Sequence, residues 1–108
     1  MSQPRRPAPE LTGKQRRFLR GLGHDLHPVV HVGQHGLTEG LLEKVVEELG
    51  HHELIKVKIA QGVMDTIKAT GEALAEQTGS HLAQVLGRTV LLYRMRKHDS
   101  EIFLPGRD

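Results

Sequence analysis

Apolar residues recur along the chain with two spacings, and these predict seven structural elements. Spacings of three to four residues predict helices over 12–22, 39–49 and 66–78, and alternating or continuous apolar runs predict strands over 29–32, 54–60, 82–86 and 89–93. Two consecutive strand–helix–strand units imply right-handed parallel crossovers, and a terminal hairpin adds an antiparallel strand. The predicted fold class is therefore α/β, a single small domain with a helix, then β-α-β-α-β-β, and a mixed four-stranded sheet.

The strand over 54–60 alternates most regularly, and it predicts how the layers are arranged. Its residues Ile55, Val57 and Ile59 share one face, which the second and third helices are expected to cover. Lys56 and Lys58 fall on the other face. That face of the sheet is expected to be solvent-exposed and basic.

Helix boundaries are expected at residues with the usual capping chemistry. Thr38 and Asp65 are the candidate N-caps of the second and third helices, and Gly50 and Gly79 are their candidate ends. Within the third helix, Gly71 costs about 1 kcal/mol relative to alanine. We expect it to permit close packing of that helix on the sheet.

The first helix is amphipathic and strongly basic on one side. Its apolar side is predicted to consist of Leu11, Gln15, Phe18, Leu19 and Leu22. The opposite side carries Arg16, Arg17 and Arg20, with Lys14 flanking them. One side would pack on the domain, while the other would form a cationic stripe suited to phosphate.

The segment from Val29 to Leu37 joins a buried strand directly to a helix through a glycine-bounded loop. Gly33 is expected to make the turn and Gly36 to allow close backbone approach. The N–H groups of His35, Gly36 and Leu37 are expected to be free at the positive end of the helix dipole, where an anion could bind. The alternative is a tight connection whose glycines serve geometry alone.

Composition points to a polyanionic partner. The 108 residues suffice for one domain, and the net charge of +2 is distributed unevenly: residues 1–30 hold six Lys/Arg and two acids, 31–80 four and eight, and 81–108 five and three. The absence of cysteine excludes disulfides and thiolate chemistry. No membrane-length apolar stretch or signal core is visible, so a cytoplasmic protein is expected.

Catalytic and metal sites are not expected. The spacing of His27, His31 and His35 aligns them on no regular element, and His51 and His52 are expected to diverge in a helix-to-strand connection. Neither a nucleophile elbow nor a P-loop or dinucleotide motif occurs. The outer carboxylates of the second helix are interpreted as a solvated face: Glu39, Glu43, Glu47 and Glu48. With three aromatic residues in the chain, any nucleic acid would be recognised mainly through backbone and shape.

Three motifs together resemble the CRM domain family, named for chloroplast RNA splicing and ribosome maturation, and in particular its stand-alone bacterial YhbY-like members. They are Leu26-His27-Pro28-Val29-Val30, Gly33-Gln34-His35-Gly36-Leu37-Thr38-Glu39-Gly40 and His51-His52-Glu53-Leu54-Ile55-Lys56-Val57-Lys58. The resemblance covers about Leu11 to Pro105. It implies an RNA-binding domain shaped like the C-terminal domain of translation initiation factor three, with a G-x-x-G loop similar in role to that of KH domains. It also implies association with precursors of the large ribosomal subunit.

The sequence departs from many relatives between the two glycines of the loop, where Gln34 and His35 stand in place of basic residues. We therefore expect the arginines of the first helix to contribute more of the affinity, and the loop to contribute mainly backbone donors. Lys56, Lys58, Arg88 and Arg94 are weaker candidates for RNA contact.

The sequence as a whole predicts a non-enzymatic, monomeric RNA-binding assembly factor without cofactor or metal. Three regions are expected: a disordered basic arm over 1–10, an RNA-binding domain over 11–95 and a C-terminal tail over 96–108, whose docking stays open. The alternative is a protein-interaction module recruited by a ribosomal protein. It would use the acidic second helix and the apolar tail Ile102 to Leu104.

Overall fold

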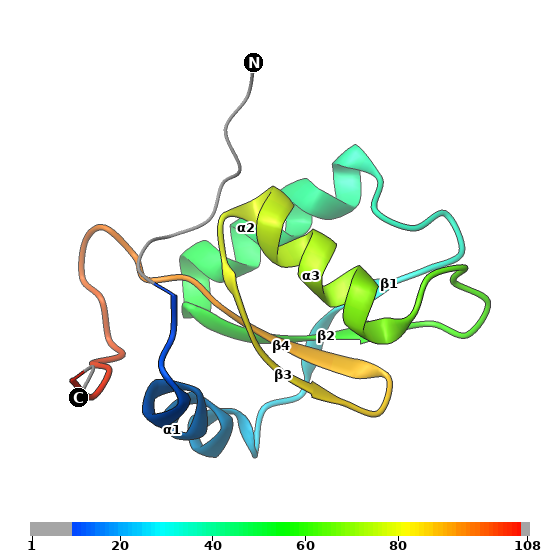
Figure 1. The fold of residues 1–108 in the computed structure, drawn as a ribbon. Helices are drawn as coiled ribbons and strands as arrows, with labels where there is room; N and C mark the ends of the chain where they lie inside the picture. Colours follow the sequence, from blue (N-terminus) through cyan, green and yellow to red (C-terminus); the bar gives the residue numbers. More distant parts are fainter. Residues whose placement is uncertain (1–9, 107–108) are drawn as a thin grey trace.

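The computed structural model describes residues 10–106 and confirms the predicted order of elements (Figure 1). The elements are α1 (Gly13–Gly23), β1 (Pro28–Val32), α2 (Glu39–His52), β2 (Leu54–Ile59), α3 (Ile67–Thr78), β3 (His81–Leu86) and β4 (Thr89–Tyr93). The expected arm over 1–10 lies outside the described residues except for Glu10. No helix in residues 10–106 has the length and apolar character needed to cross a bilayer.

The sheet is mixed and four-stranded, with the strand order β1-β2-β4-β3. β1 pairs with β2 in parallel, and β4 pairs with both β2 and β3 in antiparallel fashion. β3 therefore runs in the same direction as β2 with β4 inserted between them. The predicted α/β class is confirmed, and both crossover helices connect strands that point the same way.

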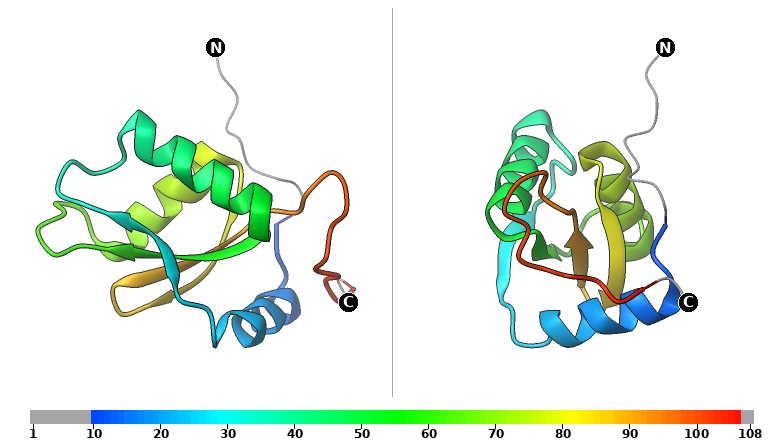
Figure 2. Two further views of the ribbon diagram at one scale, coloured as in Figure 1. Left: turned by 180° about the vertical axis from the view of Figure 1, so that it is seen from behind. Right: turned by 90° about the vertical axis from the view of Figure 1, so that its left-hand side faces the viewer.

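Each face of the sheet is covered by different helices. α2 and α3 lie on the face of Ile55, Val57 and Ile59, as predicted, and enclose the larger core (Figures 1 and 2). α1 lies across the opposite face. There Leu19 of α1 and Leu11, which precedes the helix, form a second core with buried side chains of the sheet: Leu54, Ala83, Leu91 and Tyr93. The expected solvent-exposed basic face is therefore exposed only in part, because α1 covers the rest.

Two predicted helix boundaries differ from the structure, and one packing prediction is confirmed. α2 does not end at Gly50: it continues to His52 and ends where Glu53 adopts a φ of 62°, with the Glu53 N–H donating to Leu49 O at 2.9 Å. Thr66 rather than Asp65 caps α3, since its hydroxyl accepts from the Ala69 N–H. The third helix does pack closely on the sheet.

The close packing occurs at Gly71. A Cβ at this position would lie 2.9 Å from Val90 Cγ1 and 3.0 Å from Leu82 Cδ1. Only a residue without a side chain allows this distance between α3 and the sheet. The glycine therefore improves packing at the expense of helix propensity, as predicted.

The C-terminal tail docks on the domain through Glu53, which is 1% exposed to solvent. The Glu53 carboxylate accepts four hydrogen bonds from the tail: from the Arg96 N–H (2.9 Å), the Ser100 hydroxyl (2.7 Å), the Glu101 N–H (2.6 Å) and the Ile102 N–H (3.2 Å). Burial raises its pKa, but these donors outweigh burial and hold the pKa below its ordinary value. The tail is thus fixed by a buried anion.

Apolar contacts also hold the tail in place. Ile102 and Leu104 pack against the core beneath α1, and the Gln15 side-chain amide donates to Pro105 O at 2.9 Å. Phe103 is left 79% exposed. The alternative reading of the apolar tail as a free protein-binding segment therefore loses two of its three apolar residues to the fold.

Candidate nucleic-acid interface

The loop between β1 and α2 has its unusual backbone conformation at its second glycine. Gly36 has a φ of 71°, whereas Gly33 has no positive φ. The Gly36 N–H donates to Gly33 O at 3.0 Å, and the Thr38 N–H donates to Gly36 O at 3.1 Å. The turn begins at Gly33, as expected, but the expectation that it requires a glycine there is wrong, and so is the expectation that the Gly36 N–H is free. The turn needs a glycine at position 36 because a left-handed φ is costly for residues with a Cβ.

The start of α2 remains suited to an anion. The Thr38 hydroxyl accepts from the Leu41 N–H at 3.1 Å, which confirms Thr38 as the N-cap. Among the described residues, no hydrogen bond engages the N–H of His35 or Leu37. Gln34 and His35 are both exposed. Backbone donors and the positive end of a helix dipole therefore lie at one exposed loop.

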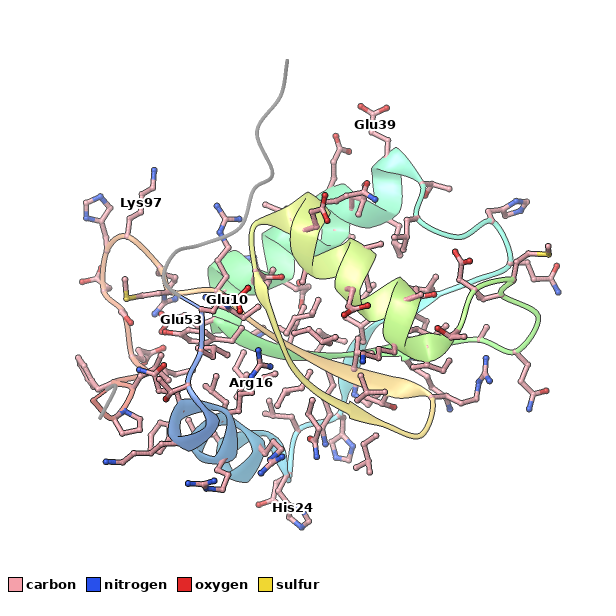
Figure 3. The ribbon with its side chains drawn as sticks, viewed as in Figure 1. Glu10, Arg16, His24, Glu39, Glu53 and Lys97 are labelled. Atoms are coloured by element: carbon pink, nitrogen blue, oxygen red, sulfur yellow. The ribbon has the colours of Figure 1, made fainter. Side chains whose placement is uncertain are left out.

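The four cations of α1 separate into two groups. Arg16 is half-buried and directed toward the sheet, where its Nη1 donates to Leu82 O (Figure 3). The expectation that it shares the outer side with the other cations is wrong. Lys14, Arg17 and Arg20 are exposed, and no hydrogen bond or ion pair within residues 10–106 engages them. These three residues form the α1 cation patch.

The predicted apolar side of α1 is also narrower than expected. Gln15 and Leu19 are buried, but Phe18 and Leu22 are 39% and 46% exposed. The helix contacts the sheet along a single line of residues, because only one face of a short helix can reach the strands. Exposed apolar surface therefore borders the α1 cation patch.

The lysines of β2 differ in exposure along the strand. Lys56 is half-buried, with its Nζ 3.4 Å from His24 O, whereas Lys58 is exposed. His31 is the register partner of Lys58 on β1, and it is exposed too. The part of the sheet that α1 leaves uncovered thus carries Lys58 and His31 near the β1–α2 loop.

Arg88 and Arg94 lie at opposite ends of β4. The Arg88 Nε donates to Ile59 O at 2.9 Å and its Nη2 to Ala60 O, so this side chain braces the β3–β4 turn against the end of β2. The Arg94 N–H donates to Glu53 O at 2.8 Å, beside the docked tail. The structure therefore places Arg88 near the β1–α2 loop, and it places Arg94 far from it.

The predicted site residues do not form one cluster. One group lies at the end of the sheet where β1 and β2 finish: the β1–α2 loop, Lys58 and Arg88. α1 lies across the other end of the sheet, on the face opposite α2 and α3 (Figure 1). Lys56 and the uncovered strands lie between these two regions. An RNA that contacts both would have to cross the sheet.

Two histidines lie where sequence reasoning did not place them. His51 and His52 form the last turn of α2, and Glu47, Glu48 and His51 present ligand atoms that all lie within 4.8 Å of one another. The reason given for expecting no metal here, divergence in a connection, was wrong. Exposed carboxylates and imidazoles on a helix are common without an ion, and we assign none.

The surroundings of His81 shift its pKa from the ordinary value. Burial lowers its pKa below 6.5, and the nearby Arg16 lowers it further, while Glu10 opposes the change. Its ring stacks on Tyr93 with centroids 6.3 Å apart. The lowered pKa disfavours the charged imidazolium, so His81 is a poor source of positive charge for an anion-binding surface.

Sequence reasoning missed the loop between β2 and α3. This loop starts beside the β1–α2 loop, since a Cβ built on Gly62 would lie 4.0 Å from Gln34 Nε2. Its Met64 is 99% exposed. The available signal was the parallel pairing of two consecutive strands, because such strands end at the same edge of a sheet.

The chain is a small α/β domain with exposed cations and an open helix start, a class of protein suited to binding a polyanion. Residues 11–94 match the family model described as the CRS1 / YhbY (CRM) domain, so the chain belongs to this family.

Its relatives are named as RNA-binding proteins. The chain is 42% identical to an RNA-binding protein of Haemophilus influenzae, over 90% of this chain and 97% of that one. It is 39% identical to the probable RNA-binding protein YqeI of Bacillus subtilis, over 88% of this chain and 99% of that one. The solution structure of SAV1595 from Staphylococcus aureus superimposes with a TM-score of 0.77 at 41% identity, covering 88% of this chain and 99% of that one.

Proposed function

We propose that this protein is a non-enzymatic, monomeric RNA-binding factor that acts in the cytoplasm on precursors of the large ribosomal subunit. It binds ribosomal RNA through phosphate contacts. The observation that carries the proposal is the α1 cation patch: Lys14, Arg17 and Arg20 are exposed and engaged by no partner among residues 10–106. Such cations attract a polyanion and release its counterions on binding.

Two further features support the proposal. The β1–α2 loop offers backbone donors at the start of α2. The relatives of the chain by sequence are named as RNA-binding proteins. The CRM resemblance implies the large-subunit precursor as the target. Arg16 and Arg88 were expected to contact RNA alone, but both also donate hydrogen bonds to backbone carbonyls of the sheet. They are expected to affect folding as well as binding.

The first test is the salt dependence of RNA binding. Replacing Lys14, Arg17 and Arg20 with glutamate is expected to weaken binding to structured ribosomal RNA across sequences. The slope of log affinity against log salt is negative, and its magnitude should decrease by about 2 to 3, since each lost phosphate contact removes about 0.7 to 0.9. Fluorescence anisotropy at four salt concentrations would measure both quantities.

A matched control separates the patch from net charge. Lys44, Lys68 and Lys97 are also exposed, and their replacement by glutamate changes the net charge by the same amount. This second variant is expected to retain most of the salt slope. Equal slopes in the two variants would mean that the α1 cation patch is merely a solvated surface.

The second test concerns the target. On a sucrose gradient the protein is expected to migrate with particles at or just before the mature large subunit, and high salt should release it. Cells that lack it should accumulate large-subunit precursors. Migration with small subunits, or free of RNA, would contradict the assignment.

A further inference from the structure

The β2–α3 loop lies beside the candidate phosphate site and is held firmly at its base. β1 and β2 are parallel neighbours, so both loops leave the sheet at the same edge (Figures 1 and 2). The Ala60 N–H donates to Val32 O at 2.9 Å, and Ile59 N–H to Arg88 O at 2.8 Å. Arg88 in turn donates to the carbonyls of Ile59 and Ala60. Backbone pairing and one arginine thus brace the start of the loop.

Within this loop, Met64 differs from its apolar neighbours. Val63 and Ile67 are half-buried and pack against the larger core, whereas Met64 is 99% exposed. Gly62, with a φ of 91°, turns the chain before them. The fold therefore uses the apolar residues on either side of Met64 and leaves this one thioether in solvent.

We propose that the β2–α3 loop is a second RNA-contacting element, in which Met64 packs against an unpaired nucleobase while the β1–α2 loop holds the adjacent phosphate. The inference rests on the proposed function and adds to it a class of target: structured RNA with an unstacked nucleotide, as at a bulge or an internal loop. A thioether suits this contact because it is polarizable and flexible, and it interacts favourably with flat aromatic rings.

The charges around the loop favour a base over a phosphate at this position. Asp65 follows Met64 directly and is exposed, so an anion would be repelled there. On the other loop, the N–H of His35, the residue after Gln34, is engaged by no hydrogen bond within residues 10–106 and is available to a phosphate. The two loops therefore divide one nucleotide between them, with the phosphate at the start of α2 and the base on Met64.

The experiment compares two RNA hairpins that differ by one unpaired adenosine. Wild-type protein is expected to prefer the bulged hairpin. The Met64→Ala variant should bind the bulged hairpin about three- to tenfold more weakly, with unchanged affinity for the fully paired hairpin and an unchanged salt slope. Met64→Leu, which keeps an apolar side chain, should restore part of the preference.

Met95 provides a matched control, because it is also an exposed methionine but lies in the segment after β4, next to the tail. Met95→Ala is expected to bind both hairpins as the wild type does. Equal binding of both hairpins by the wild type and Met64→Ala would overturn the inference, and the α1 charge variants would still report on the proposed function. Loss of wild-type binding to any RNA would overturn both.

A protein contact at Met64 would give a different result. In that case Met64→Ala would bind both hairpins normally but dissociate from precursor particles on a gradient. Such an outcome would overturn the inference in favour of a ribosomal protein partner at this loop. Association of Met64→Ala with the particles, together with loss of bulge preference, is the result expected here.

Discussion

The surroundings of the two ends of α2 offer hydrogen-bond donors to an anion in opposite ways. At its C-terminal end, the Glu53 carboxylate occupies a ring of donors from the tail: three backbone N–H groups and one hydroxyl (Figure 3). At its N-terminal end, near Glu39, the β1–α2 loop leaves the N–H groups of His35 and Leu37 without a partner in residues 10–106. One end is closed by an internal anion and the other is open to an external one.

This difference shows how similar chemistry stabilises the fold at one end of the helix and stays available to an external anion at the other. A buried carboxylate that accepts four hydrogen bonds fixes a segment permanently, because removing it would leave several donors desolvated and unpaired. Exposed donors at a helix start carry no such penalty, since water satisfies them until an anion arrives.

The largest effect is expected at the closed end. Glu53→Gln should lower the free energy of unfolding by about 2 to 4 kcal/mol, because a neutral amide replaces the charged acceptor and its NH₂ group opposes the donors. Chemical denaturation would measure the loss, and hydrogen exchange should show release of residues 96–102. Glu43→Gln, an exposed change on the same helix, should stay within about 0.5 kcal/mol. Comparable losses in both variants would contradict a special role for Glu53.

The same carboxylate makes a signed prediction about pH. Its folded-state pKa lies below the ordinary 4.5, so its contribution is fully present above that value and is lost as pH falls through the folded-state pKa. The stability difference between wild type and Glu53→Gln should therefore be constant near pH 6 to 7 and shrink below about pH 4.5. Denaturant titrations of both proteins from pH 7 to pH 3 would show this. A gap that widens in acid would contradict the assignment.

A smaller effect is expected at the open end. Gly36→Ala should cost about 1 to 2 kcal/mol, because alanine resists the φ of 71°. Gly33→Ala should cost little, since its φ is not positive and no atom lies within 4 Å of an added Cβ. Thermal melts of the two variants would compare them. Equal destabilisation would mean that the loop needs both glycines for its shape.

RNA binding by a further variant at position 36 sharpens the comparison. Gly36→Asn tolerates a left-handed φ, so it should keep the stability that Gly36→Ala loses. If Gly36→Asn nonetheless binds RNA more weakly, the loop needs a bare backbone at this position for close approach to phosphate. Unchanged binding would assign Gly36 to the turn alone.

Local patterns in the sequence were sufficient for the order of elements and for the larger core. Alternation at Ile55, Val57 and Ile59 identified the face that α2 and α3 cover, and Thr38 identified the start of α2. Gly71 was interpreted correctly as a point of close approach. These features depend on periodicity and capping, which act over a few neighbouring residues.

Other features were decided by contacts between residues distant in sequence. The clamp on the tail joins Glu53 to residues more than 40 positions later, and Arg16 and Arg88 are held by carbonyls of distant strands and loops. α1 crosses the second face of the sheet, and the β2–α3 loop meets the β1–α2 loop. A helical wheel or a strand pattern shows which side of an element is apolar, but it contains no information about which distant donor or acceptor that side meets. The sequence by itself therefore determined the elements and the family resemblance, while the tertiary structure decided which cations, donors and apolar side chains remain exposed to solvent.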